Sequence, residues 1–331
     1  MNSGFWSKLK KPIMVLAPMA DVTDVAFRSI IAKYGKPDVM WTEFVSADGL
    51  ALAPEEGRKK LMRDLEYTEA ERPIVAQFFT SKPENMQKAA ELAKELGFDG
   101  VDINMGCPDR SIEKQKAGAA LIKTPALARE LIRAAKAGAG DLPVSVKTRI
   151  GFNKVEIETW LPELLNEQPA VLTLHARTRK ELSLVPARWE FVKRAVELRD
   201  QYSPETLIFG NGDAVDVADG LKKIQETGAD GIMFGRAIFG NPWLFAKDGY
   251  RPTLREKLSV MIEHTKLFLE KLGDIKNFAI MKKHYKAYVN GFPGAAELRH
   301  KLMESQTIGE IEQHVAEFLQ TTTLEVDVMR I

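Results

Sequence analysis

The chain has 331 residues, of which 45% are hydrophobic and 28% charged, and a formal net charge of +1. This length suits one large domain and one small domain with a sizeable core, and the near-neutral charge neither indicates nor excludes a nucleic-acid partner. No apolar run could span a bilayer, and residues 1–12 lack the apolar stretch of a signal peptide. The single cysteine suits a reducing compartment, and one thiol alone is a poor metal site. We therefore expect a cytoplasmic protein with no metal or membrane partner, and a monomer.

Short apolar runs that indicate buried parallel strands recur through the first 245 residues. Amphipathic helical segments lie between most of them, with clear examples over 84–96 and 124–137. The strands recur about every 31 residues, which is typical of βα units, so the sequence predicts an α/β fold, a closed (β/α)8 TIM barrel over residues 1–245. An open doubly wound sheet is the alternative, but its first βα turn usually carries a glycine-rich loop, and residues 17–21 contain no glycine. The predicted strands begin near Ile13, Val39, Ile74, Gly100, Leu142, Ala170, Leu207 and Asp230.

The only cysteine, Cys107, lies in the segment Asn-Met-Gly-Cys-Pro (104–108), directly after a predicted strand. Gly106 and Pro108 end that strand, so we expect the thiol on a loop at its C-terminal end. Most free cysteines are small buried hydrophobic residues. A cysteine between Gly and Pro on a loop has no packing role in a helix or sheet, so we predict a functional thiol.

Polar or glycine-containing segments follow most of the predicted strands, and in a barrel the C-terminal strand ends meet at the active site. Each segment alone is weak evidence, because Gly-Asn-Gly-Asp (210–213), for example, is usually only a turn. Their shared position at one end of the barrel is much less expected by chance. The residues are Pro18, Met19, Ala20, Gln77, Asn104, Lys147, Arg149, His175, Arg177, Arg179, Asn211, Gly212, Asp213, Gly235 and Arg236.

These residue types suit a phosphorylated flavin held beside a reactive thiol. Gly212 and Gly235 would let a phosphate approach the backbone at the last two loops, where barrels commonly bind one, and Arg236 adds positive charge. Lys147 would place a cation beside a ring that becomes anionic on reduction, and Gln77 offers a donor and an acceptor to a planar ring edge. The sequence therefore favours FMN over a sugar phosphate, and it lacks the Gly-x-Gly-x-x-Gly segment expected for FAD.

From about residue 13 to residue 303, the sequence resembles the tRNA-dihydrouridine synthase family. Asn-Met-Gly-Cys-Pro (104–108) is its most specific match, and Gly-Ala-Ala-Leu (118–121), Lys-Thr-Arg-Ile-Gly (147–151) and His-Ala-Arg-Thr-Arg (175–179) support it. The resemblance implies an FMN oxidoreductase, reduced by NADPH, that saturates the C5–C6 bond of specific uridines in tRNA. It also implies that the target uridine turns out of the tRNA to stack on the flavin.

The resemblance further implies roles for single residues. Cys107 would be the general acid that protonates C5 after hydride reaches C6, and Asn104 would contact the substrate base. We also expect Arg149, Arg177 and Arg179 to contact the tRNA. The implied FMN contacts are Pro18, Met19, Ala20, Gln77, Lys147, His175, Asn211, Gly212, Asp213, Gly235 and Arg236.

One stretch departs from the family pattern. Many relatives have Tyr-x-Gly-x-Ala-Asp-Trp where this chain has Ser-Leu-Val-Pro-Ala-Arg-Trp over 183–189, so Ser183, Val185 and Arg188 replace Tyr, Gly and Asp. We expect this departure to affect substrate placement or the target position and to leave the flavin site unchanged.

Residues 246–331 lose the strand pattern and are expected to form a small helical domain that binds tRNA. Lys282, Lys283 and Lys286 would share one helix face and hold the tRNA backbone, and Tyr285 and Tyr288 would pack on a sugar or base. A helical cap that only stabilises the barrel is the alternative. The apolar spacing predicts helices over 254–272, 295–303 and 308–319, and Asn-Gly-Phe-Pro-Gly (290–294) ends the helix between the first two.

Two other functions stay open on the sequence alone. A flavin barrel that acts on a small molecule, such as a dihydroorotate dehydrogenase or an ene-reductase, would share the flavin face but needs no basic helical domain. A non-catalytic RNA-binding protein of the same fold is the more distant alternative, because Cys107, Lys147 and His175 are all intact.

Overall fold

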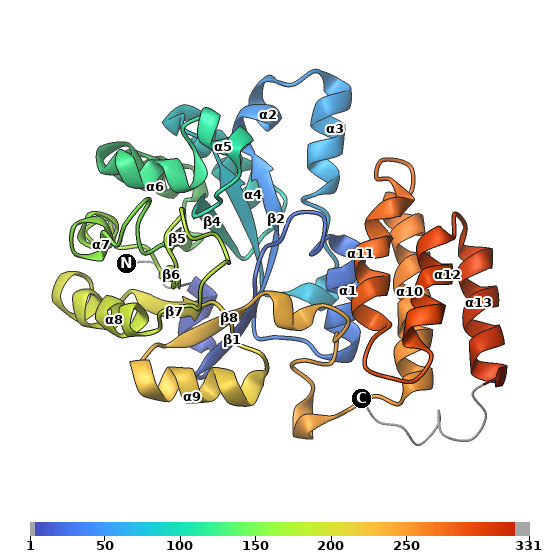
Figure 1. Cartoon of the computed structure of the whole chain (residues 1–331). Helices are drawn as coiled ribbons and strands as arrows, with labels where there is room; N and C mark the ends of the chain where they lie inside the picture. The colour runs from blue at the N-terminus through green and yellow to red at the C-terminus, as the bar shows by residue number, and fades with distance from the viewer. Residues whose placement is uncertain (1–3, 322–331) are drawn as a thin grey trace. The chain divides into compact units, whose positions relative to one another are not determined.

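The barrel strands form one sheet in a computed structural model that describes residues 4–321 (Figure 1). Residues 1–3 and 322–331, the outer ends of the two expected domains, lie outside the described residues. All eight strands are parallel, in the order β1-β8-β7-β6-β5-β4-β3-β2, and are almost wholly buried, as expected for a sheet covered on both faces. The strands are β1 (Ile13–Leu16), β2 (Met40–Ser46), β3 (Ile74–Phe79), β4 (Gly100–Met105), β5 (Val144–Arg149), β6 (Val171–His175), β7 (Leu207–Asn211) and β8 (Gly231–Phe234).

The sheet closes on itself between its first and last strands in the order. Val15 of β1 forms a parallel bridge with Val39, immediately before β2. The Leu16 N–H donates to the Val39 carbonyl at 3.2 Å, and β1 pairs with β8 on its other side. The predicted TIM barrel is therefore confirmed, and each of the eight predicted strands is present.

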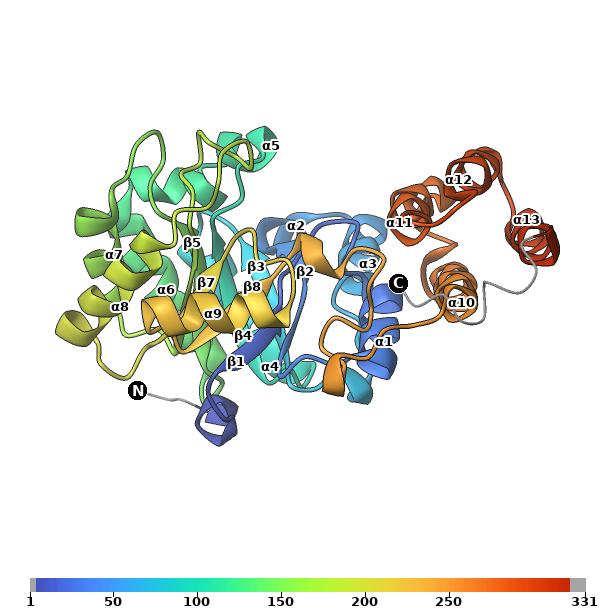
Figure 2. The same ribbon diagram turned by 60° about the horizontal axis from the view of Figure 1, so that its bottom comes forward.

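Helices follow the strands and pack around the outside of the barrel (Figures 1 and 2). Their ends carry ordinary capping signals. In α9, Asp216 accepts a hydrogen bond from the Asp219 N–H, and Gly228 ends the helix at a φ of 74°, which favours glycine. The helices of this part are α2 (Ala47–Leu52), α3 (Glu55–Arg63), α4 (Pro83–Glu95), α5 (Arg110–Lys114), α6 (Pro125–Ala139), α7 (Ile157–Leu165), α8 (Glu190–Tyr202) and α9 (Val217–Thr227).

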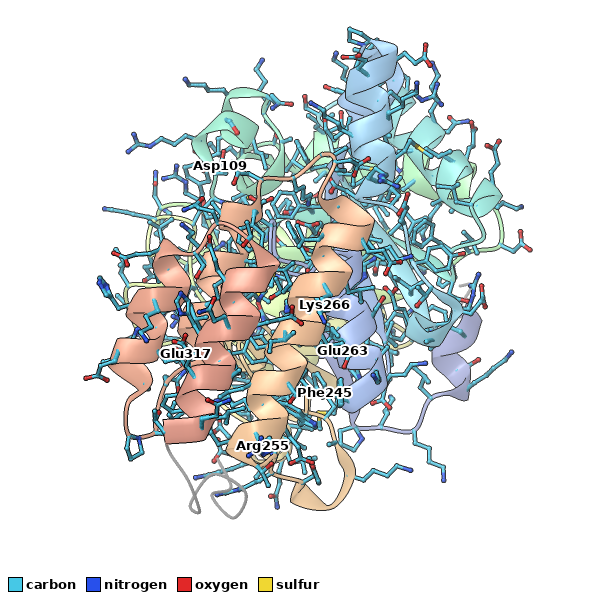
Figure 3. The ribbon with its side chains drawn as sticks, turned by 90° about the vertical axis from the view of Figure 1, so that its right-hand side faces the viewer. Asp109, Phe245, Arg255, Glu263, Lys266 and Glu317 are labelled. Carbon is cyan, nitrogen blue, oxygen red and sulfur yellow. The ribbon has the colours of Figure 1, made fainter. Side chains whose placement is uncertain are left out.

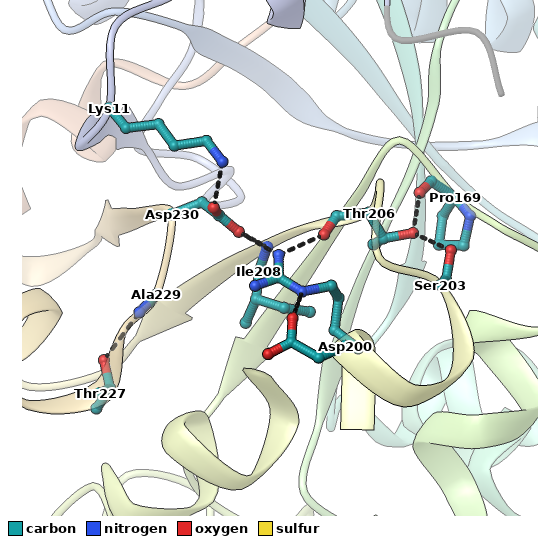
Figure 4. Close-up of polar contacts among 10 residues, drawn as sticks. Lys11, Pro169, Asp200, Ser203, Thr206, Ile208, Thr227, Ala229 and Asp230 are labelled. Atoms are coloured by element: carbon teal, nitrogen blue, oxygen red, sulfur yellow. Dashed lines mark hydrogen bonds and ion pairs between the residues drawn. The ribbon is translucent and has the colours of Figure 1, made fainter. Parts of the chain in front are cut away.

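The N-terminal ends of β7 and β8 are tied together by a buried carboxylate (Figure 4). Asp230 accepts hydrogen bonds from Arg199 Nη1 at 2.7 Å, from the Ile208 N–H at 2.8 Å and from Lys11 Nζ at 2.6 Å. Nearby, the rings of Trp6 and Phe209 pack edge to face, with centroids 5.5 Å apart. This end of the barrel is filled by packed side chains, so a functional site is expected at the opposite, C-terminal ends of the strands.

Tertiary contacts divide the chain into two compact units. The first contains residues 1–20 and 37–235, and the second contains residues 21–36 and 236–331. The helix that follows β1 therefore groups with the C-terminal helices, whereas the sequence placed the boundary at residue 245. The main helices of the second unit are α1 (Val25–Tyr34), α10 (Leu254–Leu272), α11 (Met281–Tyr288), α12 (Ala295–Glu304) and α13 (Ile308–Thr321).

Salt bridges on the surface of the second unit join its helices in pairs. Glu263 of α10 accepts hydrogen bonds from Lys33 at 2.7 Å and from the Tyr34 hydroxyl at 2.6 Å, both at the end of α1. Lys266 of α10, which is labelled in Figure 3, lies 2.6 Å from Glu312 of α13. α10 has the predicted bounds and begins with a capping box of Thr253 and Glu256. The four predicted C-terminal helices are thus confirmed.

Candidate functional site

A row of polar side chains crosses the C-terminal ends of β3, β4, β5 and β7. Strand register places Asn104 beside Lys147 and His175 beside Asn211. Asn104 Nδ2 donates to Gln77 Oε1 at 3.1 Å, and Lys147 Nζ donates to Asn211 Oδ1 at 3.3 Å. The barrel therefore brings together residues that lie far apart in the sequence, as the predicted fold requires.

Cys107 lies two residues beyond the end of β4, on the predicted loop, and is partly exposed. Asn104 Oδ1 accepts hydrogen bonds from the backbone N–H groups of Cys107, at 2.9 Å, and Gly106, at 3.1 Å. Gly118 packs against the same loop at a φ of +61°, and a Cβ at this position would lie 2.8 Å from the Cys107 carbonyl oxygen. Burial raises the pKa of the Cys107 thiol, so the protonated form dominates at neutral pH.

Lys147 is a partly buried cation in the middle of this row. Among the described residues its Nζ has the single hydrogen bond to Asn211, which leaves two donor protons for a ligand. Burial lowers the pKa of Lys147 to about 8, and the neighbouring Arg149 adds to this effect, whereas the carboxylate of Asp102 opposes it. A ligand that carries negative charge would favour the protonated form of this lysine.

The segment after β6 is tied to the segment after β7. Arg177 is buried, forms an ion pair with Asp213 and lies 3.2 Å from His175 Nε2 through its Nη1 atom. The Asp213 carboxylate also accepts the Ala187 N–H at 2.8 Å, and Trp189 Nε1 donates to the Gly212 carbonyl at 2.9 Å. The 183–189 loop thus contacts two predicted cofactor residues, but it does so through Ala187 and Trp189, which match the family pattern. The expectation that the departure leaves the flavin site unchanged therefore stays a prediction.

The three arginines expected to contact tRNA are already engaged by the protein. Arg149 is 5% exposed and donates to the carbonyls of Gly106, Thr178 and Leu182. Arg177 is 2% exposed. Neither guanidinium can reach a phosphate directly, so we revise both roles to that of holding the loops in place. Arg179 pairs with Glu113 of α5 and is partly exposed, so its contact with tRNA stays a prediction.

The remaining predicted cofactor residues follow β1 and β8. Pro18 is buried, Met19 partly buried and Ala20 exposed. A Cβ at Gly235 would lie 3.8 Å from Met19 Sδ, so the backbone of Gly235 is open to a close approach. Arg236 begins the short 3-10 helix η4 (Arg236–Ile238) directly after it.

The lysines of α11 lie on the side of the helix opposite its buried residues. Met281, His284, Tyr285 and Tyr288 form the buried side, whereas Lys282 and Lys283 are partly exposed and Lys286 is exposed. Within the described residues, no acidic group pairs with these three lysines. The expectation that Tyr285 and Tyr288 pack on a sugar or base is wrong, because both rings are fully buried.

Two buried residues near this row of polar side chains, Asp102 and Ser145, were not singled out from the sequence. Asp102 of β4 accepts hydrogen bonds from Gln77 Nε2 and from Ser145 Oγ, each at 2.5 Å. Burial raises the pKa of Asp102 to about 6. A carboxylate inside a predicted buried strand was the available signal, since such residues are rarely buried without partners.

No cluster of three or more His, Cys, Asp or Glu side chains within residues 4–321 is placed to hold a metal ion. Nor is any helix in the same range both long and apolar enough to cross a membrane.

The fold and the site define the class of protein: a (β/α)8 barrel whose lone cysteine, central lysine and buried amides meet at the C-terminal strand ends, where barrel enzymes act. The family model described as Dihydrouridine synthase (Dus) matches residues 15–324. A probable tRNA-dihydrouridine synthase of Staphylococcus aureus (strain MRSA252) is 40% identical over 96% of both chains. Probable tRNA-dihydrouridine synthase 2 of Bacillus subtilis (strain 168) is 42% identical over 96% of this chain and 97% of that protein. The chain therefore belongs to the dihydrouridine synthase family.

More distant solved structures share the barrel alone. Histamine dehydrogenase from Rhizobium sp. 4-9 has a TM-score of 0.52 at 13% identity, covering 77% of this chain and 48% of that one. The TM-score indicates a common fold, and an identity of 13% carries no information about the ligand.

Proposed function

We propose that this protein is a tRNA-dihydrouridine synthase that reduces the C5–C6 bond of specific uridines in tRNA, with FMN as cofactor and NADPH as reductant. The observation that carries the proposal is the place of Cys107. A protonated, partly exposed thiol lies on the loop after β4, and Asn104 Oδ1 accepts a hydrogen bond from the backbone N–H of Cys107 in that loop. Family membership supplies the reaction class.

The residues at the strand ends fit a flavin mononucleotide. Bound FMN would supply hydride to C6 of the uracil ring. Lys147 offers two free donor protons and a positive charge to a ring that becomes anionic, and Gln77 has donor and acceptor capacity beyond its bonds to Asp102 and Asn104. Gly235 leaves room for a phosphate near the backbone, and Arg236 follows it with a charge.

Cys107 would complete the reduction by giving its Sγ proton to C5. The raised pKa of the thiol keeps this proton in place at neutral pH, which a general acid requires. Asn104 is 6% exposed, and its side chain is used by Gln77 and by the Cys107 loop. It can therefore orient the base and the thiol together.

The unpaired lysines of α11 support a tRNA substrate over a small molecule. Lys282, Lys283 and Lys286 form a basic face without acidic partners among the described residues. Such a face suits a phosphate backbone, whereas orotate or a small enone needs none.

Purification and tRNA mapping would test this proposal. The protein should be yellow, and extraction should release FMN. Dihydrouridine mapping in tRNA from cells with and without the gene should show at least one position that depends on it. Reduction rates with NADPH and NADH would test the reductant. Release of FAD, release of no flavin, or activity on orotate without activity on tRNA would reject the proposal.

A further inference from the structure

Four polar side chains from three neighbouring strands are linked by hydrogen bonds into one series that ends at the Cys107 loop. They are Gln77, Asp102, Asn104 and Ser145. Register places Gln77 of β3 beside Asp102 of β4, and Asp102 beside Ser145 of β5. Asp102 is 1% exposed and Gln77 is fully buried. Side chains of this kind stay buried only when hydrogen bonds replace the water that they lose.

Every hydrogen bond in this series is donated toward Asp102, from both of its sides. Gln77 Nε2 donates to Asp102 Oδ2 at 2.5 Å, and Asn104 Nδ2 donates to Gln77 Oε1 at 3.1 Å. Asn104 Oδ1 then accepts the Cys107 N–H at 2.9 Å. On the other side of Asp102, Ser145 Oγ donates to Oδ1 at 2.5 Å.

The ends of the series determine the orientation of the two amides between them. An ionised carboxylate can only accept, and a backbone N–H can only donate. An amide side chain could otherwise turn by 180° and exchange its oxygen and nitrogen at little cost in shape. With Asp102 at one end and the Cys107 N–H at the other, a single arrangement satisfies every group.

We propose that Asp102 is a positioning residue: its carboxylate orients the Gln77 amide, Gln77 orients Asn104, and Asn104 holds the Cys107 loop in place. The inference rests on the proposed function, in which Gln77, Asn104 and Cys107 serve the cofactor, the base and the proton. Asp102 is buried and its two carboxylate oxygens are used by Gln77 and Ser145, so it would act through Gln77 rather than by direct contact with cofactor or substrate.

Substitutions at Asp102 separate its hydrogen bonds from its charge. In Asp102→Asn the amide oxygen can still accept from Gln77, while its nitrogen donates to Ser145 Oγ, so the orientation is retained. Asp102→Leu has nearly the same shape and removes both acceptors. Ser145→Ala is the matched control, because it deletes a buried partner of Asp102 on the side away from Gln77.

The readout is the alkylation of Cys107 by iodoacetamide in the full-length protein freed of flavin, followed by intact mass across a range of pH. Cys107 is the only cysteine in the chain, so the label reports this loop alone. Asp102→Leu should raise the alkylation rate roughly fivefold, the factor that corresponds to one lost hydrogen bond. Asp102→Asn and Ser145→Ala should stay near the wild-type rate.

A charge exchange keeps the test decisive if Asp102→Leu does not fold. Gln77→Glu places two carboxylates against each other, so the hydrogen bond between positions 77 and 102 forms only while they share a proton. The rate of Cys107 alkylation should therefore gain a new dependence on pH. When Asp102→Asn is added to Gln77→Glu, the amide at position 102 donates to the carboxylate at position 77. The hydrogen bond then needs no shared proton, and the added pH dependence should disappear.

Three results would overturn the proposal. The first is a double variant, Gln77→Glu with Asp102→Asn, that keeps the pH dependence of Gln77→Glu alone. The second is an Asp102→Leu variant that folds and is alkylated at the wild-type rate. An Asp102→Asn variant that is altered as much as Asp102→Leu would show that charge rather than orientation matters, which also contradicts it. Because this assay needs neither FMN nor tRNA, its outcome is independent of whether the proposed reaction is correct.

Discussion

Burial raises the pKa of the Cys107 thiol and so keeps it protonated, and Asn104 accepts a hydrogen bond from its backbone N–H. We expect Cys107→Ala to lower uridine reduction by about 10²–10⁴-fold, the usual contribution of general acid catalysis. Flavin content and the oxidation of NADPH by oxygen should stay nearly unchanged, since neither needs this proton. Single-turnover oxidation of the reduced flavin by tRNA measures the first effect.

The pH dependence gives this prediction a second test. The protonated thiol is present below its pKa and is lost as the pH rises through it. Because that pKa is raised, the alkaline loss of uridine reduction should begin above the usual range of a thiol. A Cys107→Ala variant that reduces tRNA at the wild-type rate would show that the residue is only structural.

Lys147 provides the other charge at the proposed reaction centre. We expect Lys147→Met, which keeps an unbranched side chain one atom shorter and removes the charge, to weaken FMN binding by roughly ten- to a hundredfold, the range for a lost hydrogen bond to a charged group. Flavin reduction by NADPH should also slow, because the developing negative charge loses its partner. Fluorescence titration of the flavin-free protein measures the affinity.

Lys193 offers the matched control for this substitution. It is exposed on α8, so Lys193→Met makes the same chemical change away from the strand ends. Equal FMN affinity in the Lys147→Met and Lys193→Met variants would remove Lys147 from the cofactor site.

At the scale of elements, the loop after β6 is held by Arg149 of β5 and by Arg179 within the loop. Arg149 donates to the carbonyl of Gly106 beside Cys107 and to the carbonyl of Leu182 in this loop. Arg179 joins the same loop to Glu113 of α5. The loop ends in an exposed apolar tip, where Leu184 is 82% exposed. The residues that depart from the family pattern therefore lie in a loop that Arg149 joins to the Cys107 loop and that is hydrogen-bonded to Asp213.

The basic face of α11 leads to a prediction about tRNA binding. Replacing Lys282, Lys283 and Lys286 together by Glu should raise the Michaelis constant for tRNA and flatten its dependence on salt, because fewer counterions are released on binding. Flavin content should not change. Initial rates at several salt concentrations measure both quantities.

The control is a triple charge reversal elsewhere, Lys8→Glu, Lys10→Glu and Lys193→Glu, at exposed positions. Lys8 and Lys10 precede β1, at the end of the barrel opposite Cys107. If both triple variants weaken tRNA binding equally, overall charge rather than α11 is responsible, and if neither does, the helices serve only as a structural cap.

The elements could be predicted from the sequence because their signals are local. The strands are short apolar runs and α10 carries its apolar stripe and its capping residues within 254–272, so its bounds were correct. The roles of Arg149 and Arg177 could not be predicted, because their partners are backbone carbonyls and a carboxylate that only the folded loops bring near. Tyr285 and Tyr288 were misjudged because helical spacing alone does not reveal which face other helices cover.

At the scale of the whole molecule, the second unit has a core that includes two histidines. His264 and His284 are fully buried, their ring centroids lie 4.6 Å apart, and Phe27 stacks on His264 at 4.8 Å. Neither imidazole has a hydrogen-bond partner among the described residues. Burial lowers the pKa of His284 to about 3 and that of His264 well below its usual value, and Lys283 further opposes the charging of His284.

These pKa shifts predict that the second unit loses stability in mild acid. Both histidines are neutral in the folded unit but take up a proton near pH 6.5 when unfolded, so the unfolded state binds more protons below that pH. The free energy of opening should therefore fall between pH 7 and pH 5 by roughly 1–2 kcal/mol for each histidine. Buried Asp24, whose pKa is raised, acts in the opposite direction, so the histidine effect must be isolated by variants.

Hydrogen exchange of peptides from α10 and α11, corrected for the intrinsic effect of pH, measures this opening in the full-length protein. His284→Phe should reduce the difference between pH 7 and pH 5 by the share of one histidine, because no proton is taken up at that position. His300→Phe is the control, since His300 on α12 is exposed beside Glu304. The same pH difference in wild type, His284→Phe and His300→Phe would show that the buried histidines do not govern the acid stability of this unit.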